Sequence, residues 1–151
     1  MVAGVEVPID TSANAEAMAE AIFGDSVQVV SATYTGDPDS SGIYDDTNND
    51  APGVVPGPTG VILSTGDTSA FTNNNASQSN LNTGTTTGSS GPNNVQDFND
   101  AAGASTFDAS FLDVTFIPDG DVMTMQFVFA SEEYPEFTNS QFQDLVGVFS
   151  K

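Results

Sequence analysis

Carboxylates are the residues of this chain whose types and spacing could do chemistry. The segment Asp37-Pro38-Asp39-Ser40-Ser41-Gly42 matches the opening of a calcium-binding loop, in which alternate oxygen ligands converge on the ion and a glycine permits the sharp turn. The twelfth position is Asn48 rather than Glu, so this is not an EF-hand proper. An ordinary Asx-rich turn is the alternative interpretation.

Two further groups of carboxylates lie in the last third of the chain. Asp119-Gly120-Asp121 joins two expected strands, where Asp-Gly is also a standard hairpin turn. Glu132 and Glu133 follow a strand and point to opposite faces, so one of them could be buried and would then be protonated, hydrogen-bonded or metal-bound. The candidate calcium ligands are Asp37, Asp39, Asp45, Asp46, Asp119, Asp121, Glu132 and Glu133.

The charge balance is one-sided. The chain has 21 Asp and Glu against a single cationic side chain, that of Lys151, and its net charge is −20. Residues 1–150 can therefore form no internal salt bridge between side chains, and nucleic acid and anionic membrane surfaces are excluded as partners. A solvated acidic surface is the simplest interpretation, and calcium (Ca²⁺) is the only cofactor that the composition favours.

The residues that are missing exclude further chemistry. With no Cys and no His, the chain lacks zinc sites, thiol nucleophiles and the usual Ser–His–Asp triad, so we predict that it is not an enzyme. No apolar stretch approaches the roughly 20 residues that a membrane helix needs. The N-terminus lacks the pattern of a secretory signal, so export would depend on a signal already removed or on one outside this sequence.

The patterning predicts one mostly-β domain over 1–151, built of sandwich-like antiparallel sheets with one N-terminal α-helix. We expect the helix over 13–23, capped by Thr11 or Ser12 and stopped by Gly24. The expected strands cover 26–35, 60–65, 109–118, 122–130 and 144–149, the third and fourth forming a hairpin. The segment 66–105 is rich in Asn, Ser, Thr and Gly, and we interpret it as a long polar loop that contributes little to the core.

Several segments together resemble the choice-of-anchor L domain of secreted bacterial proteins. The residues that carry the resemblance are SGIYDD (41–46), GVILSTGD (60–67) and FLDVTFIPDGDVMTMQFVFASEEYPEF (111–137). The resemblance implies an exported or surface-exposed module without established enzymatic activity, whose domain continues beyond the strand at 144–149. On that basis the chain is either a fragment or is completed by strands from another polypeptide.

These observations predict an extracellular or cell-surface structural or adhesive module, stabilised by calcium. We expect it to self-assemble through an open strand edge, with other copies of itself or a strand-donating polypeptide as partners. A calcium-dependent carbohydrate-binding module is the alternative, in which Tyr34, Tyr44 and Tyr134 would hold a glycan. A glycosidase with two carboxylates is a more remote one.

Overall fold

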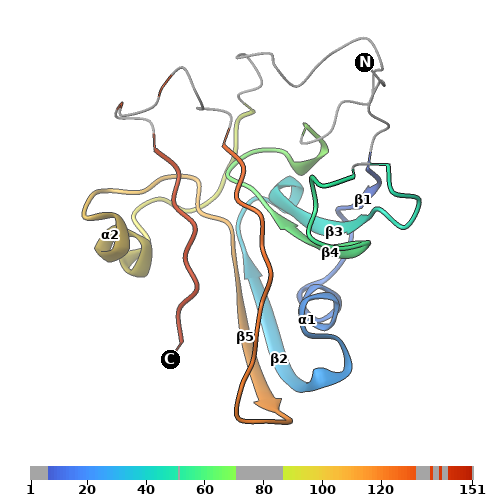
Figure 1. Cartoon of the computed structure of the whole chain (residues 1–151). Coiled ribbons are helices and arrows are strands. Elements are labelled where there is room, and N and C mark those ends of the chain that lie inside the picture. Colours follow the sequence, from blue (N-terminus) through green and yellow to red (C-terminus); the bar gives the residue numbers. More distant parts are fainter. Residues whose placement is uncertain are drawn as a thin grey trace.

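The computed structural model describes residues 7–50, 52–70, 87–131, 137, 140 and 143–150 of the chain. Its regular elements lie in two antiparallel sheets with two short α-helices beside them (Figure 1), so the predicted mostly-β antiparallel fold is confirmed. No helix in these ranges is long and apolar enough to cross a membrane. The elements in chain order are β1 (Ile9–Asp10), α1 (Ala15–Phe23), η1 (Gly24–Ser26), β2 (Val27–Thr35), η2 (Pro38–Ser40), β3 (Ser41–Asp45), β4 (Thr59–Leu63), η3 (Thr68–Ala70), α2 (Gln96–Ala102) and β5 (Phe111–Pro118).

The smaller strands form a three-stranded sheet in the order β1-β3-β4. β3 is its central strand, and Tyr44 of β3 pairs with Ile9 on one side and Gly60 on the other. The side chain of Tyr44 is buried against Val7, and Ile9 and Val55 pack around the two. This cluster fixes the loop that follows β3 to the face of the sheet.

The longer strands, β2 and β5, pair with each other and run side by side in Figure 1. The pairing register shifts between Val29 and Ser31, so Val30 is the extra residue of a β-bulge and its side chain is 57% exposed. Because the bulge adds one residue, the less exposed face changes from Val27 and Val29 to Ala32 and Tyr34. The strand predicted at 26–35 is therefore confirmed. Its less exposed side chains are odd-numbered before the bulge and even-numbered after it.

The N-terminal helix begins two residues later than predicted. Asn14 is its N-cap, and its side-chain oxygen accepts a 2.8 Å hydrogen bond from the backbone N–H of Ala17. The predicted caps Thr11 and Ser12 were wrong, because the backbone N–H and the hydroxyl of Ser12 both donate to the carboxylate of Asp10 instead. Asp10 and Ser12 thus close a turn ahead of the helix.

The end of α1 is the one predicted from the sequence. Gly24 ends the helix with φ of 58°, a conformation that favours glycine. Met18 and Ala19 are buried, and the helix packs against β2 and β4, which lie in different sheets. The ring of Phe23 lies 4.8 Å from that of Phe116 on β5, measured between ring centroids. α1 thus contacts both sheets.

Several elements were not predicted, among them β1, β3 and α2. β3 lies in a stretch rich in Gly and Pro, and α2 lies within the polar segment 66–105. α2 ends at Gly103, which has φ of 66°, and the ring of Phe98 packs edge-on against Phe111 at 5.5 Å. The described parts of the polar segment, residues 66–70 and 87–105, therefore pack against the rest of the fold, with Thr68 fully buried.

Two of the predicted strands are absent from the part of the chain that the structure describes. The chain turns after β5 at Asp119-Gly120, as expected, but residues 122–131 and 143–150 form no strand. β5 pairs with β2 along one edge, and residues 121–130 make no hydrogen bond to its other edge or to any other described residue. Only the first strand of the predicted hairpin is therefore present. The second arm, predicted at 122–130, lacks the ladder of hydrogen bonds that defines a strand.

Candidate functional site

The predicted calcium loop begins at Asp37, whose carboxylate is engaged in hydrogen bonds. One oxygen accepts a 3.0 Å bond from the backbone N–H of Asp39, and the other accepts bonds of 2.6 and 2.7 Å from the hydroxyl and the backbone N–H of Ser90. These bonds, that from the Ser90 hydroxyl above all, lower the pKa of Asp37 below its usual value. Asp37 therefore caps the η2 turn and ties it to a residue 53 positions away.

A network of hydroxyl groups surrounds this turn. The Tyr34 hydroxyl donates to the carbonyl of Asp37 at 2.8 Å and lies 3.0 Å from the hydroxyl of Ser110. The Ser110 hydroxyl also donates to the carbonyl of Ser40, whose own hydroxyl donates to the carbonyl of Gly66 at 2.8 Å. The fully buried Thr68 donates to the carbonyl of Asp39 at 3.0 Å. The Asx-rich turn, the alternative to the calcium loop, describes this arrangement well.

The remaining carboxylates of the region differ in burial. Asp39 and Asp45 are exposed, whereas Asp46 is only 6% exposed. One carboxylate oxygen of Asp45 accepts a 2.9 Å hydrogen bond from the backbone N–H of Thr47, and hydrogen bonds from the hydroxyl and the backbone of Thr47 lower the pKa of Asp45. Asp45 is therefore the start of a second Asx turn, and Asp46 alone of the three faces the interior.

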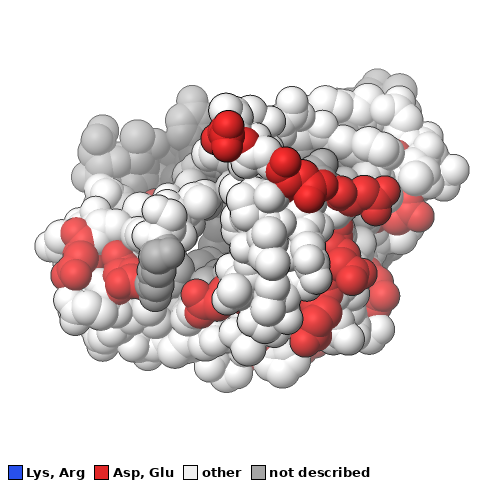
Figure 2. All heavy atoms as spheres, turned by 90° about the horizontal axis from the view of Figure 1, so that it is seen from below, with Lys and Arg blue, Asp and Glu red and all other residues white. Residues whose placement is uncertain are grey.

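The other predicted calcium ligands lie apart from this loop. Asp119 and Asp121 are exposed in the turn after β5, and Glu132 and Glu133 lie outside the described residues. Figure 2 shows Asp and Glu side chains spread over one face of the molecule. Among the described residues no three acidic side chains come close enough together to hold a metal ion, and calcium binding stays a prediction.

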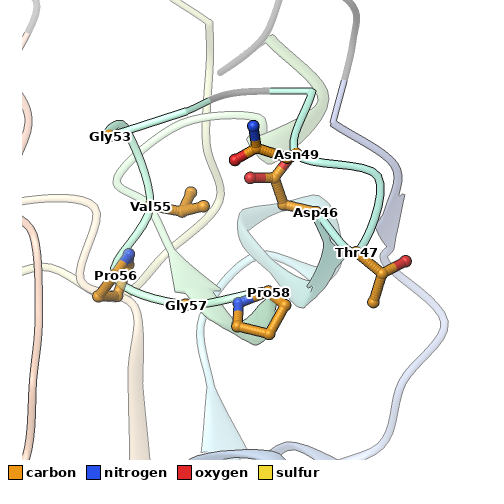
Figure 3. Close-up of a pocket in the computed structure, with 8 residues that line it drawn as sticks. All are labelled: Asp46, Thr47, Asn49, Gly53, Val55, Pro56, Gly57 and Pro58. Carbon is orange, nitrogen blue, oxygen red and sulfur yellow. The ribbon is translucent and has the colours of Figure 1, made fainter.

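Asp46 lines a hollow inside the loop that joins β3 to β4. The hollow has a volume of about 300 Å³, and Asn49, Val55, Pro56 and Pro58 also line it. In Figure 3 the side chains of Asp46, Asn49 and Val55 point into the loop, while that of Thr47 points away from it. The sequence analysis did not predict that Asn49, Pro56 and Pro58 would line a hollow. The only sequence feature that indicated a loop of this kind was the high content of Gly and Pro in this stretch.

Exposed apolar residues are concentrated at the C-terminal end of the described chain. We call residues 121–130 and 143–150 the C-terminal apolar segments. The Ser131 hydroxyl, just beyond the first segment, donates to Asp144 in the second at 2.5 Å, and the ring of Phe149 lies 5.6 Å from that of Phe98 of α2. The large apolar residues of these segments that are exposed are Val122, Met123, Met125, Phe127, Val128, Phe129, Leu145, Val146, Val148 and Phe149.

Comparison with known proteins gives one match. A family described as Choice-of-anchor L domain matches residues 6–151, which is nearly the whole chain. No curated protein and no solved structure matches.

Proposed function

The chain belongs to the choice-of-anchor L domain family, and on that premise we propose that it is an extracellular structural or adhesive module that binds other polypeptides through its C-terminal apolar segments. Membership in the family makes it a surface-associated bacterial module. The structural role and the mode of binding are the parts that we propose.

The exposure of the C-terminal apolar segments is the observation that carries the proposal. Val122 is 84% exposed, Phe127 61% and Val148 71%, and the segments hold ten of the large apolar residues that remain exposed. Large exposed apolar surfaces are uncommon on soluble monomers and commonly mark an interaction surface. Burial of these side chains would stabilise a complex by about 25 cal/mol for each Å² of apolar surface removed from water, before the costs of association.

The backbone supports strand addition as the mode of binding. Residues 121–130 make no backbone hydrogen bond to the described residues, so their N–H and C=O groups are available to an incoming strand. Such unpaired edges commonly pair with other chains. If residues 121–130 became a strand on binding, Met123, Met125 and Phe127 would share one face at a spacing of two, which would give the added strand a surface to pack on.

The charge of the chain determines which conditions favour a second copy as the partner. Two copies would bring together net charges of −20 each, with Asp119 just before the first apolar segment and Asp121 at its first position. Salt screens this repulsion, because the Debye length falls from about 10 Å at 0.1 M to about 3 Å at 1 M. Calcium would add neutralisation by carboxylate binding, so we propose it as a promoter of assembly.

Sedimentation velocity across sodium chloride and calcium chloride concentrations tests the proposal. We expect the sedimentation coefficient to rise with salt, and at lower concentrations with calcium. Phe127→Asp should reduce this association, whereas Phe107→Asp should not, because Phe107 is equally exposed, at 62%, but lies outside both segments. A chain that stays monomeric under every condition, or equal effects of the two substitutions, would contradict the proposal.

A further inference from the structure

The free edge of β5 is a candidate binding site for a strand. Within the part of the chain that the structure describes, β5 pairs with β2 along one edge and has no strand partner along the other. The first apolar segment, residues 121–130, follows β5 after the turn at Asp119-Gly120 and makes no backbone hydrogen bond to the described residues. An unpaired strand edge and an unpaired stretch of backbone therefore occur in the same copy.

The sequences of these two stretches fit each other as antiparallel strands. A two-residue turn at Asp119-Gly120 sets the register, because it places Pro118 opposite Asp121. Three apolar pairs then lie opposite one another on one face: Phe116 and Met123, Val114 and Met125, and Leu112 and Phe127. The β5 members of these pairs are half-buried, and on the exposed face Thr115 would lie opposite Thr124. A shift by one residue would place the apolar side chains of the segment on the polar face, so the sequence specifies this register.

The first apolar segment is also the part of the chain with the least charge. Residues 122–131 contain no Asp or Glu, although the chain has 21, and Asp113 is the one acidic residue of β5. Asp119 and Asp121 lie outside the three apolar pairs. Two copies with net charges of −20 would therefore repel each other less along this segment than through an acidic surface.

Pro118 disfavours the same pairing within one copy. A two-residue hairpin turn is closed by two hydrogen bonds between the residues that flank it, here Pro118 and Asp121. Pro118 has no backbone N–H, so one of these two bonds cannot form. In the structure the chain has turned at Asp119-Gly120, and yet the segment makes no hydrogen bond to the β5 of its own copy. The β5 edge of a second copy offers the same register without a tight turn to close.

We propose that copies of this chain exchange their first apolar segments, each segment adding a third strand to the sheet of another copy along the free edge of β5. This inference rests on the proposed function, and it names the partner and the register of that binding. Residues 119–121 are the hinge, opened out so that Pro118 no longer flanks a tight turn. Reciprocal exchange between two copies gives a closed dimer with a twofold axis, whereas exchange with the next copy in turn gives a filament.

Introduced cysteines test the register, because the chain has no cysteine of its own. Thr115 and Thr124 are both exposed, and opposed residues of an antiparallel pair lie within the Cα separation of about 4.4–6.8 Å that a disulfide spans. Equal amounts of the Thr115→Cys and Thr124→Cys variants are mixed in salt and oxidised mildly. We expect their mixed disulfide to form several-fold faster than that between Thr33→Cys and Thr124→Cys, since Thr33 is exposed on the same face but lies on β2, one strand farther away.

Two further variants separate exchange from pairing within one copy. The double variant Thr115→Cys/Thr124→Cys should give disulfide-linked dimers at a rate that rises with protein concentration. Pro118→Val restores the missing N–H, so it should favour the hairpin within one copy and lower the associated fraction in sedimentation several-fold. Ile117→Val changes the neighbouring side chain without adding an N–H and should leave that fraction unchanged.

The outcomes distinguish this inference from the proposed function. Association in sedimentation without the mixed disulfide of Thr115→Cys and Thr124→Cys would overturn the inference and leave the proposed function standing. A disulfide within single chains of the double variant, formed at a rate independent of concentration, would also overturn it, because the segment would then pair with its own β5. An unchanged associated fraction in Pro118→Val would contradict the role of the hinge. A chain that is monomeric under every condition would remove both the inference and the proposed function.

Discussion

Substitution of Gly91 by alanine should destabilise the fold through backbone contact alone. Gly91 is buried, and a β-carbon added there would lie 2.7 Å from the carbonyl oxygen of Ala109 and 2.8 Å from the carbonyl carbon of Asp108. Both contacts are far closer than van der Waals separation, and both are with backbone, so no side chain can rotate away. Asp108 is also held at a left-handed φ of 54°, which limits how its peptide can move.

The size of the effect follows from the displacement that the contact requires. The backbone of Asp108 and Ala109 must retreat by several tenths of an ångström, which strains the 3.0 Å hydrogen bond from the Ala109 N–H to the Pro92 carbonyl. Overpacking of this kind costs about 1–3 kcal/mol. For a chain of this length, each 1 kcal/mol lowers the melting temperature by about 2–4 °C.

Gly88→Ala is the matched control for this prediction. Gly88 lies three residues away in the same segment, has no positive φ, and a β-carbon there would meet nothing within 4 Å. Its substitution should be neutral or stabilising by about 0.4–1 kcal/mol, because alanine reduces the entropy of the unfolded chain. Urea unfolding of the two variants provides the assay. Equal stabilities would refute the reasoning and would show that residues 87–94 are not packed against the start of β5.

Two further predictions concern single side chains. Asp37→Asn should make the free energy of unfolding depend less on pH in the acid range. Hydrogen bonds hold the folded-state pKa of Asp37 below its usual value of 3.8. The ionised carboxylate therefore stabilises the fold above that value, and this stabilisation is lost as pH falls through the lower folded-state pKa. Urea midpoints measured from about pH 5 to about pH 2 check this, and identical slopes for both proteins would count against it. Asn14→Ala should lower the free energy of unfolding by about 1 kcal/mol through loss of the helix cap. Ser12→Ala should change it less, and a larger effect of Ser12→Ala would mean that the cap has been misassigned.

The strongest periodic patterns in the sequence predicted their elements correctly. The alternation in β5 and the apolar stripe of α1 with its glycine stop are local signals, and the structure has both elements. The bulge at Val30 is not visible locally, because Val29 and Val30 are both β-branched strand formers and only the register with β5 defines the bulge. β3 was missed because its Ser and Gly residues favour turns, and its neighbours β1 and β4 override that preference.

The candidate site shows the same division between local and long-range information. The pattern beginning at Asp37 correctly indicated a structured turn, since its carboxylate accepts from Asp39 two residues on. The contact with Ser90 spans 53 positions and has no signature in the sequence, so nothing indicated that this carboxylate serves as a tie between segments. The hollow at Asp46 depends likewise on the closure of a loop by backbone hydrogen bonds, which composition does not specify.

The tie between Asp67 and Thr87 has a consequence for how this chain can vary in length. The backbone N–H of Asp67 donates to the hydroxyl of Thr87 at 2.7 Å, so two points of the chain 20 positions apart are held together. Thr68 is fully buried and donates to the carbonyl of Asp39, so the framework on this side extends into η3. The entropic cost of closing a loop grows only with the logarithm of its length, by about 0.6 kcal/mol for each doubling. We therefore expect insertions between η3 and Thr87 to cost little, which makes this stretch a graft point for a peptide tag or a whole domain. The ties of Ser90 and Gly91 to the framework set the limit of that freedom on the C-terminal side.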